Sequence, residues 1–172
     1  MQTPFSVNDD VRRSAGRVKL LLMDCDGVLT DGRLYFTESG EAMKVFHVRD
    51  GQGLALWHAA GFKSGVISGR HARAIIEARA REVGIVHVRV GSTDKVADLE
   101  EILAEAGVAA EECAFIGDDI GDIEIMKRVG LAIAVADAAP EVISQAGFVT
   151  NTVGGHGAVR EVIDLLLKVQ KK

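Results

Sequence analysis

Short runs of hydrophobic residues alternate along the chain with longer stretches in which hydrophobic positions recur every three or four residues. The runs that predict strands are residues 18–24, 62–68, 85–89, 113–117 and 131–135. The stretches that predict helices are residues 52–60, 71–83, 95–106, 122–129, 140–146 and 158–169. Strands that are apolar along nearly their whole length are typical of a parallel sheet covered by helices on both faces. The pattern therefore predicts an α/β fold, a doubly wound three-layer sandwich around a mostly parallel sheet.

One segment departs from this alternation. Residues 33–47 contain two short strand-like stretches around a turn at Glu38-Ser39-Gly40, which predicts a β-hairpin that projects as a flap. The connections between the other strands have no insertion long enough for a cap domain. We therefore expect one domain over residues 1–172, with an N-terminal extension at 1–16, the flap, and a C-terminal helical segment at 154–172.

Composition and charge narrow the classes of function. The chain is 48% hydrophobic and 26% charged, an ordinary globular balance, and its formal net charge of -5 excludes the basic surface of a typical nucleic-acid binder. The two cysteines, Cys25 and Cys113, each adjoin an apolar run, so we expect buried thiols in a reducing compartment. No apolar segment approaches the ~20 residues that cross a bilayer, and residues 1–16 lack the apolar core of a secretory signal. We expect a cytoplasmic protein without a membrane or nucleic-acid partner.

Polar residues that can carry chemistry collect where the predicted strands end. Asp24, Ser68 and Asp118 lie at or just past the carboxyl end of a strand, and Lys95 opens the helix after another. In open parallel sheets, ligands bind outside these carboxyl ends. The four residues are therefore predicted to converge on one site.

The segment Asp24-Cys25-Asp26-Gly27 places two carboxylates two residues apart as the chain leaves an apolar strand. Side chains alternate along an extended chain, so both carboxylates can point to the same space. Asp24 can then act as a nucleophile that accepts a phosphoryl group, and Asp26 as the acid and base that serves it. A calcium loop is the competing interpretation, but the later ligand positions are missing and a strand, not a helix, precedes the motif.

Ser68 and Lys95 are ambiguous when each is considered alone. The Ser68 hydroxyl can hold a phosphoryl oxygen beside a helix N-terminus, or it can simply cap that helix. Lys95 lies in a first helical turn, where the helix dipole prefers an acidic residue. It is either a phosphate-holding cation or a solvated surface lysine.

Three carboxylates, Asp118, Asp119 and Asp122, follow the strand at 113–117 within five residues. Such a cluster of hard oxygen ligands suits Mg²⁺, which usually takes one or two carboxylates together with water and substrate phosphate. Helix capping by Asp118 or Asp119 is the alternative, but it does not require three carboxylates.

These four elements, in this order, resemble the motifs of the haloacid dehalogenase superfamily from residue 18 onward. The resemblance implies that Asp24 is the nucleophile, that Asp26 is the general acid and base, and that Ser68 and Lys95 hold the phosphate. It also implies a Mg²⁺ cofactor. Its ligands would be Asp24, the main-chain carbonyl of Asp26, Asp118 and waters, with Asp119 assigned to the metal site and Asp122 near the ion or bracing Lys95.

A narrower likeness is to the branch of this superfamily without a cap domain that hydrolyses 3-deoxy-D-manno-octulosonate 8-phosphate (KDO 8-phosphate), a precursor for lipopolysaccharide. It is carried by the motifs Phe46-His-Val-Arg-Asp-Gly51, Ser68-Gly-Arg70 and Gly154-Gly-His-Gly-Ala-Val-Arg-Glu161. The resemblance implies a sugar-acid phosphate substrate. The substrate-binding residues would be Asp26, Arg49, Asp50, Gly51, Arg70, Arg79 and Lys95, with Arg70 and Arg79 meeting the carboxylate.

The same likeness implies a homotetramer in which neighbouring subunits close the active site. The aromatic residues Tyr35, Phe36 and Phe46 on the flap favour a subunit interface there, because exposed apolar patches usually mark one. Two alternatives stay open: a phosphatase of a nine-carbon, sialic-acid-like sugar phosphate, which Arg70 disfavours, and a non-catalytic, phosphatase-like assembly module.

Overall fold

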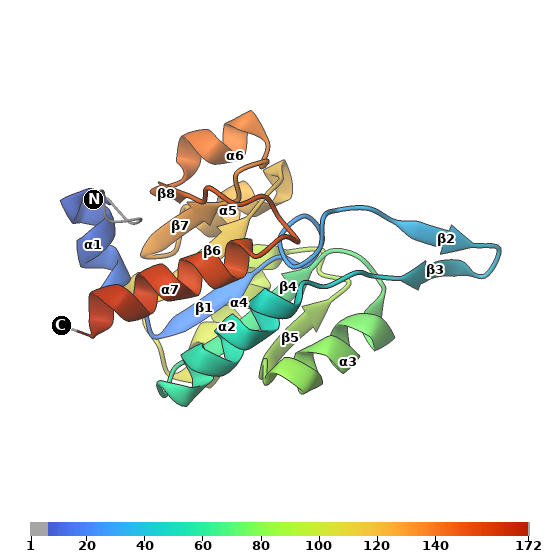
Figure 1. Cartoon of the computed structure of the whole chain (residues 1–172), viewed down its shortest axis with the longest axis horizontal. Helices are drawn as coiled ribbons and strands as arrows, with labels where there is room; N and C mark the ends of the chain where they lie inside the picture. Colours follow the sequence, from blue (N-terminus) through green and yellow to red (C-terminus); the bar gives the residue numbers. More distant parts are fainter. Residues whose placement is uncertain (1–6, 172) are drawn as a thin grey trace.

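A computed structural model describes residues 7–171. Its centre is a six-stranded sheet in the order β5-β4-β1-β6-β7-β8, and every pair of neighbouring strands is parallel (Figure 1). The strands are β1 (Leu20–Met23), β4 (Lys63–Ser68), β5 (His87–Val90), β6 (Cys113–Gly117), β7 (Leu131–Ala134) and β8 (Phe148–Val149).

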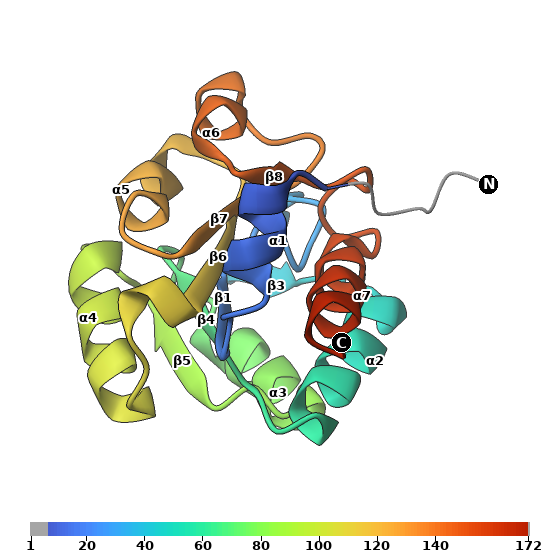
Figure 2. The same cartoon turned by 90° about the vertical axis from the view of Figure 1, so that its left-hand side faces the viewer.

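Helices cover both faces of the sheet. They are α1 (Asp9–Ala15), α2 (Val48–Ala59), α3 (Arg73–Val83), α4 (Lys95–Ala106), α5 (Ile123–Met126), α6 (Pro140–Gln145) and α7 (Ala158–Gln170), with 3₁₀ turns η1 (Ala110–Glu112) and η2 (Ile120–Asp122). Figure 2 shows α2, α3 and α7 on one side of the sheet and α4, α5 and α6 on the other. The predicted three-layer α/β architecture is confirmed.

The middle of the sheet is the core of the protein. All four residues of β1 are completely buried, because β4 and β6 flank the strand and helices cover both of its faces. Burial on both faces explains why β1 has no polar alternation in its sequence. Cys25 and Cys113 are free, buried thiols, as predicted.

The flap consists of β2 (Tyr35–Thr37) and β3 (Gly40–Met43), which pair antiparallel. It extends away from the sheet as a two-stranded arm (Figure 1). Residues 7–171 contain no cap domain, and no helix in this range is long and apolar enough to span a bilayer.

The structure differs from the sequence prediction in four places. The predicted extension contains α1, although its residues 1–6 lie outside the described part of the chain. Helix α2 begins at Val48, four residues early, because the Nδ1 atom of His47 accepts a hydrogen bond from the backbone N–H of Arg49 and caps the helix. The helix predicted at 122–129 is divided into η2 and a shorter α5, and β8 is too short to leave a recognisable pattern.

Candidate active site

Three neighbouring strands end at the same edge of the sheet. Asp24 follows β1, Ser68 ends β4 and Asp118 follows β6. The backbone N–H of Asp24 still donates to the carbonyl of Ile116, at 3.0 Å, so the pairing of β1 with β6 holds Asp24 in place. The chain leaves β1 first toward β4 and later returns to its other side as β6, which makes this edge the switch point where α/β sheets bind ligands.

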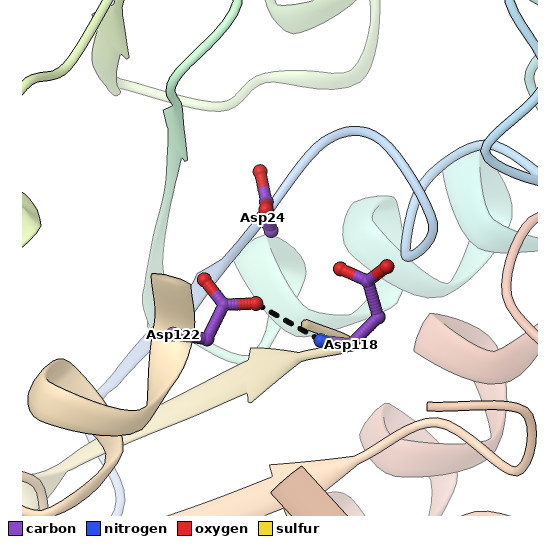
Figure 3. Close-up of side chains that lie close together, drawn as sticks. All are labelled: Asp24, Asp118 and Asp122. Atoms are coloured by element: carbon purple, nitrogen blue, oxygen red, sulfur yellow. Dashed lines mark hydrogen bonds between the residues drawn. The ribbon is translucent and has the colours of Figure 1, made fainter. Parts of the chain in front are cut away.

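Three carboxylates meet at this point. Figure 3 shows Asp24, Asp118 and Asp122, and one oxygen from each lies within 4.8 Å of the others. The Oδ2 atom of Asp122 accepts a hydrogen bond from the backbone N–H of Asp118 at 2.9 Å, which fixes the two residues relative to each other. Gly27, with φ +83°, is required here because a Cβ at this position would lie 1.9 Å from Oδ2 of Asp118.

Without a divalent cation, the three carboxylates repel one another. Burial, opposed by Lys95, raises the pKa of Asp24 to about 6. Burial together with the charges of Asp24 and Asp122 raises the pKa of Asp118 to about 8. The Oδ1 atom of Asp118 is buried and has no hydrogen-bond partner among residues 7–171. A divalent cation would give this oxygen a partner and offset the repulsion, so the donor set fits Mg²⁺.

Lys95 is not a solvated surface residue. Its Nζ atom lies 2.8 Å from Oδ2 of Asp24 and 2.7 Å from Oδ1 of Asp122, and only 14% of its side chain is exposed. The N-terminus of α4 does not depend on Lys95, because the Asp94 side chain caps the helix by accepting hydrogen bonds from the N–H groups of Val96 and Ala97. Lys95 can therefore hold an anionic group beside Asp24.

Ser68 does not cap the helix that follows it. Helix α3 begins at Arg73 with Ala72 at its N-cap, and the buried Ser68 hydroxyl accepts a hydrogen bond from the backbone N–H of Arg70 at 3.3 Å. Ser68 lines a cavity of about 200 Å³. The other residues that line this cavity are Asp24, Asp26, Gly69, Arg70, Lys95, Asp119, Gly121 and Asp122.

The flap reaches this cavity through a chain of ion pairs. Lys44, whose side chain is completely buried, contacts Oδ1 of Asp26 with its Nζ atom. The same Nζ lies 2.7 Å from Oε1 of Glu41. The other oxygen of Glu41 accepts hydrogen bonds from both Nε and Nη2 of Arg70 at 3.2 Å. Neither Lys44 nor Glu41 was among the residues predicted from the sequence.

Comparison with known proteins agrees with this geometry. The haloacid dehalogenase-like hydrolase family matches residues 67–163, more than half of the chain. The 3-deoxy-D-manno-octulosonate 8-phosphate phosphatase of Escherichia coli (strain B / BL21-DE3) is 42% identical over 166 residues, which cover 96% of this chain and 88% of that protein. The chain belongs to this family of haloacid dehalogenase-like hydrolases.

Solved structures in the same family have the same fold. The Yersinia pestis 3-deoxy-D-manno-octulosonate 8-phosphate phosphatase has a TM-score of 0.93 at 43% identity, covering 96% of this chain and 89% of the other. The Moraxella catarrhalis phosphatase, in complex with magnesium ion, phosphate ion and KDO, has a TM-score of 0.90 at 34% identity, with coverages of 95% and 93%.

The carboxylate cluster of this hydrolase differs from the predicted metal site at one residue. Asp122, and not Asp119, completes the carboxylate cluster with Asp24 and Asp118. Asp119 lines the cavity, but its Oδ1 accepts a hydrogen bond from the backbone N–H of Ile120 and caps η2. Asp122 also contacts Lys95, so it braces the lysine as well as lying in the carboxylate cluster.

Four of the predicted substrate-binding residues lie away from the cavity in this hydrolase, around the first turn of α2. Arg49 is exposed there, and Arg79 approaches Gly51 closely while donating to the carbonyl of His47 at 3.3 Å. Asp50 makes a structural contact that the sequence did not predict, and its part in substrate binding stays a prediction. Its side chain is buried, with Oδ1 accepting from the backbone N–H of Arg160 at 2.8 Å, because it anchors the start of α7 to α2.

Proposed function

We propose that this protein is a Mg²⁺-dependent phosphomonoesterase that hydrolyses KDO 8-phosphate to KDO and phosphate in the biosynthesis of lipopolysaccharide precursors. The observation that carries the proposal is the meeting of Asp24, Asp118 and Asp122 with Lys95 at the switch point of the sheet. The likeness to KDO 8-phosphate phosphatases over almost the whole chain supports the choice of substrate.

The side chains account for two half-reactions. In the first, a carboxylate oxygen of Asp24 attacks phosphorus, the ester P–O bond breaks, and Asp26 gives its proton to the departing sugar oxygen. In the second, Asp26 takes a proton from water as that water attacks phosphorus. The bond to Asp24 then breaks, and inorganic phosphate leaves with Asp24 restored as a carboxylate.

The cations and donors around Asp24 make the attack on an anion possible. Lys95 offsets the charge of the nucleophile at 2.8 Å, and Ser68, which lines the same cavity, would hold a phosphoryl oxygen. Asp24 and Asp118 would hold Mg²⁺ together with the carbonyl of Asp26, and Asp122 or Asp119 would lie beside it. When bound, this ion neutralises charge on the transferred phosphoryl group.

Arg70 is the proposed contact for the carboxylate of the sugar acid. It lines the cavity, its side chain is 39% exposed, and a guanidinium group pairs with a carboxylate through two donors. Four further residues remain proposed substrate contacts, although the single chain does not bring them to the cavity: Arg49, Asp50, Gly51 and Arg79.

We propose that the protein works as a single-domain subunit of a cytoplasmic homotetramer. The flap and the residues after it carry exposed apolar side chains, with Phe36 62% exposed and Val48 79% exposed. Such a surface is typical of an interface. Phe46, in contrast, packs partly against the core and under the guanidinium of Arg79. Sedimentation of the wild type and of Phe36→Ser tests this: wild-type protein that stays monomeric at micromolar concentrations would contradict it.

The decisive assay measures phosphate release from a panel of phosphates, namely KDO 8-phosphate, a nine-carbon sugar-acid phosphate and 4-nitrophenyl phosphate. Each is assayed with Mg²⁺ and with EDTA, for the wild type and Asp24→Asn. We expect the highest kcat/KM for KDO 8-phosphate, no turnover in EDTA, and a loss of at least about 10⁴-fold in Asp24→Asn. A preference for the nine-carbon substrate would move the assignment to that phosphatase class. Absence of turnover on every substrate would favour an assembly module.

A further inference from the structure

The two carboxylate oxygens of Asp26 have different surroundings. Its Oδ1 contacts the ammonium group of Lys44. Its Oδ2 is buried and has no hydrogen-bond partner within the described chain. One oxygen of the proposed acid and base is therefore anchored by Lys44, while the other has no partner among residues 7–171.

Lys44 is itself held in one position. It belongs to the segment that leaves β3 of the flap, its side chain has no exposed surface, and its Nζ is shared between Asp26 and Glu41. A lysine normally keeps its charged end in water. Burying this one is tolerated because two carboxylates surround it. Removing it would leave Asp26 without its cation, whereas Glu41 would keep Arg70.

We infer that Lys44 is a positioning residue for the acid and base of this phosphatase. By binding Oδ1 it fixes the orientation of the Asp26 carboxyl group, so that Oδ2 is the oxygen that gives its proton to the leaving group and later takes one from water. Glu41, which is anchored to Arg70, holds the ammonium group from the other side. The inference rests on the proposed function, because it assigns a task to Asp26 in that reaction.

A purely structural role for Lys44 makes a different prediction. If the ion pairs only tied the flap to the sheet, losing them would disturb the whole cavity and affect every substrate alike. A positioning role affects the proton transfer alone. That step matters for an alkyl phosphate, whose leaving oxygen must be protonated, and matters little for 4-nitrophenyl phosphate, whose leaving group departs as an anion.

The test compares kcat/KM for KDO 8-phosphate and for 4-nitrophenyl phosphate in the wild type, Lys44→Met and Lys44→Arg. For each substrate, kcat/KM reports only the steps up to release of the first product. A positioned general acid contributes about 10²–10⁴-fold, so Lys44→Met should lose about 10²-fold on the sugar phosphate and less than about threefold on the aryl phosphate. Lys44→Arg, which keeps the cation, should recover part of the loss.

The second half-reaction gives an independent readout. With 4-nitrophenyl phosphate, Lys44→Met should release one equivalent of nitrophenol in a burst and then turn over slowly, because water attack still requires Asp26. The exposed Lys127, which pairs with Glu124 on the surface, provides the control variant Lys127→Met. This variant should behave as wild type on both substrates.

Equal losses on the two substrates, or unchanged kinetics on both, would overturn the inference. If Lys44→Met does not fold, as judged by its thermal transition, the same comparison is made with Lys44→Gln and Lys44→Arg. These results are separate from the proposed function. That proposal fails if the wild type releases no phosphate or if Asp24→Asn stays active, whatever the Lys44 variants do.

Discussion

The carboxylate cluster at the sheet edge and the flap that reaches it are built on different physical principles. The cluster comes from the ends of buried parallel strands, where backbone pairing and a required glycine fix each side chain. The flap is a two-stranded arm without a hydrophobic core of its own, and ion pairs through Lys44 and Glu41 connect it to the cavity. An isolated two-stranded hairpin is only marginally stable.

This difference separates two aspects of the proposed enzyme. The sheet edge provides the chemistry that any phosphate monoester requires, whereas the flap and Arg70 adjust that chemistry to one kind of substrate and leaving group. Substitutions at the edge should therefore reduce turnover of every substrate. Substitutions on the flap side should change kcat/KM selectively, for one kind of substrate or leaving group.

The largest effect is expected from the sheet edge at Lys95. Replacing it in Lys95→Met removes the cation that lies 2.8 Å from Asp24 and 2.7 Å from Asp122. Loss of one charged group aimed at the transition state costs about 10²–10³-fold in kcat. We expect a fall of that size on both KDO 8-phosphate and 4-nitrophenyl phosphate, measured by phosphate release. A fall in kcat on only one of the two substrates would contradict the view that the sheet edge serves every substrate.

Arg70 should give a smaller and selective effect. In Arg70→Ala, KM for a sugar-acid phosphate should rise by about 10–100-fold, because a charge-assisted hydrogen bond contributes about 1.5–3 kcal/mol. KM for 4-nitrophenyl phosphate should stay near the wild-type value. The control is Arg128→Ala, since Arg128 pairs with Glu100 on the surface. A similar rise in KM for both substrates would show that Arg70 does not recognise the carboxylate.

The smallest effect is expected in the stability of the protein, and it arises from the carboxylate cluster at the sheet edge. Asp24 and Asp118 have pKa values raised to about 6 and about 8, so the metal-free native state binds more protons than the unfolded chain above pH 4. The free energy of unfolding should therefore fall as the pH rises from about 4 to about 8. Asp118→Asn should flatten this dependence.

Mg²⁺ should restore the lost stability, and most strongly at high pH, where it does not have to displace a proton from Asp118. At 100 times its dissociation constant, a ligand adds about 2.7 kcal/mol, which corresponds to roughly 5–10 °C in Tm for a chain of this size. Thermal scans at pH 5 and pH 8, with and without Mg²⁺, measure the effect. If Mg²⁺ raised Tm more at pH 5 than at pH 8, the assignment of the cation to these carboxylates would be contradicted.

The same two regions differ in how far the sequence predicts them. Asp24, Ser68 and Asp118 could be placed together because their strands are continuous apolar runs, and parallel strands bring their carboxyl ends to one edge. Lys44 and Glu41 could not. Their contacts with Asp26 and Arg70 depend on how the flap bends back over the sheet, and no periodicity in the sequence records that bend.

Asp50 makes a structural contact that its motif does not predict. Its place between Arg49 and Gly51 associated it with the substrate, but its carboxylate is buried against the backbone of Arg160, 110 residues further along the chain. A polar side chain that anchors one helix to another looks, in sequence, like one that binds a ligand. Asp119 and Asp122 were hard to separate for a similar reason, since the 3₁₀ turn η2 decides which of them faces Asp24.

In the proposed mechanism, Asp24 carries the phosphoryl group between the two half-reactions. Wild-type enzyme mixed with substrate and Mg²⁺, quenched in acid within milliseconds and digested, should yield a phosphorylated peptide that contains Asp24, and Asp24→Asn should yield none. Full turnover of the wild type with no phosphorylated peptide at any quench time, or with the label on another residue, would contradict the account.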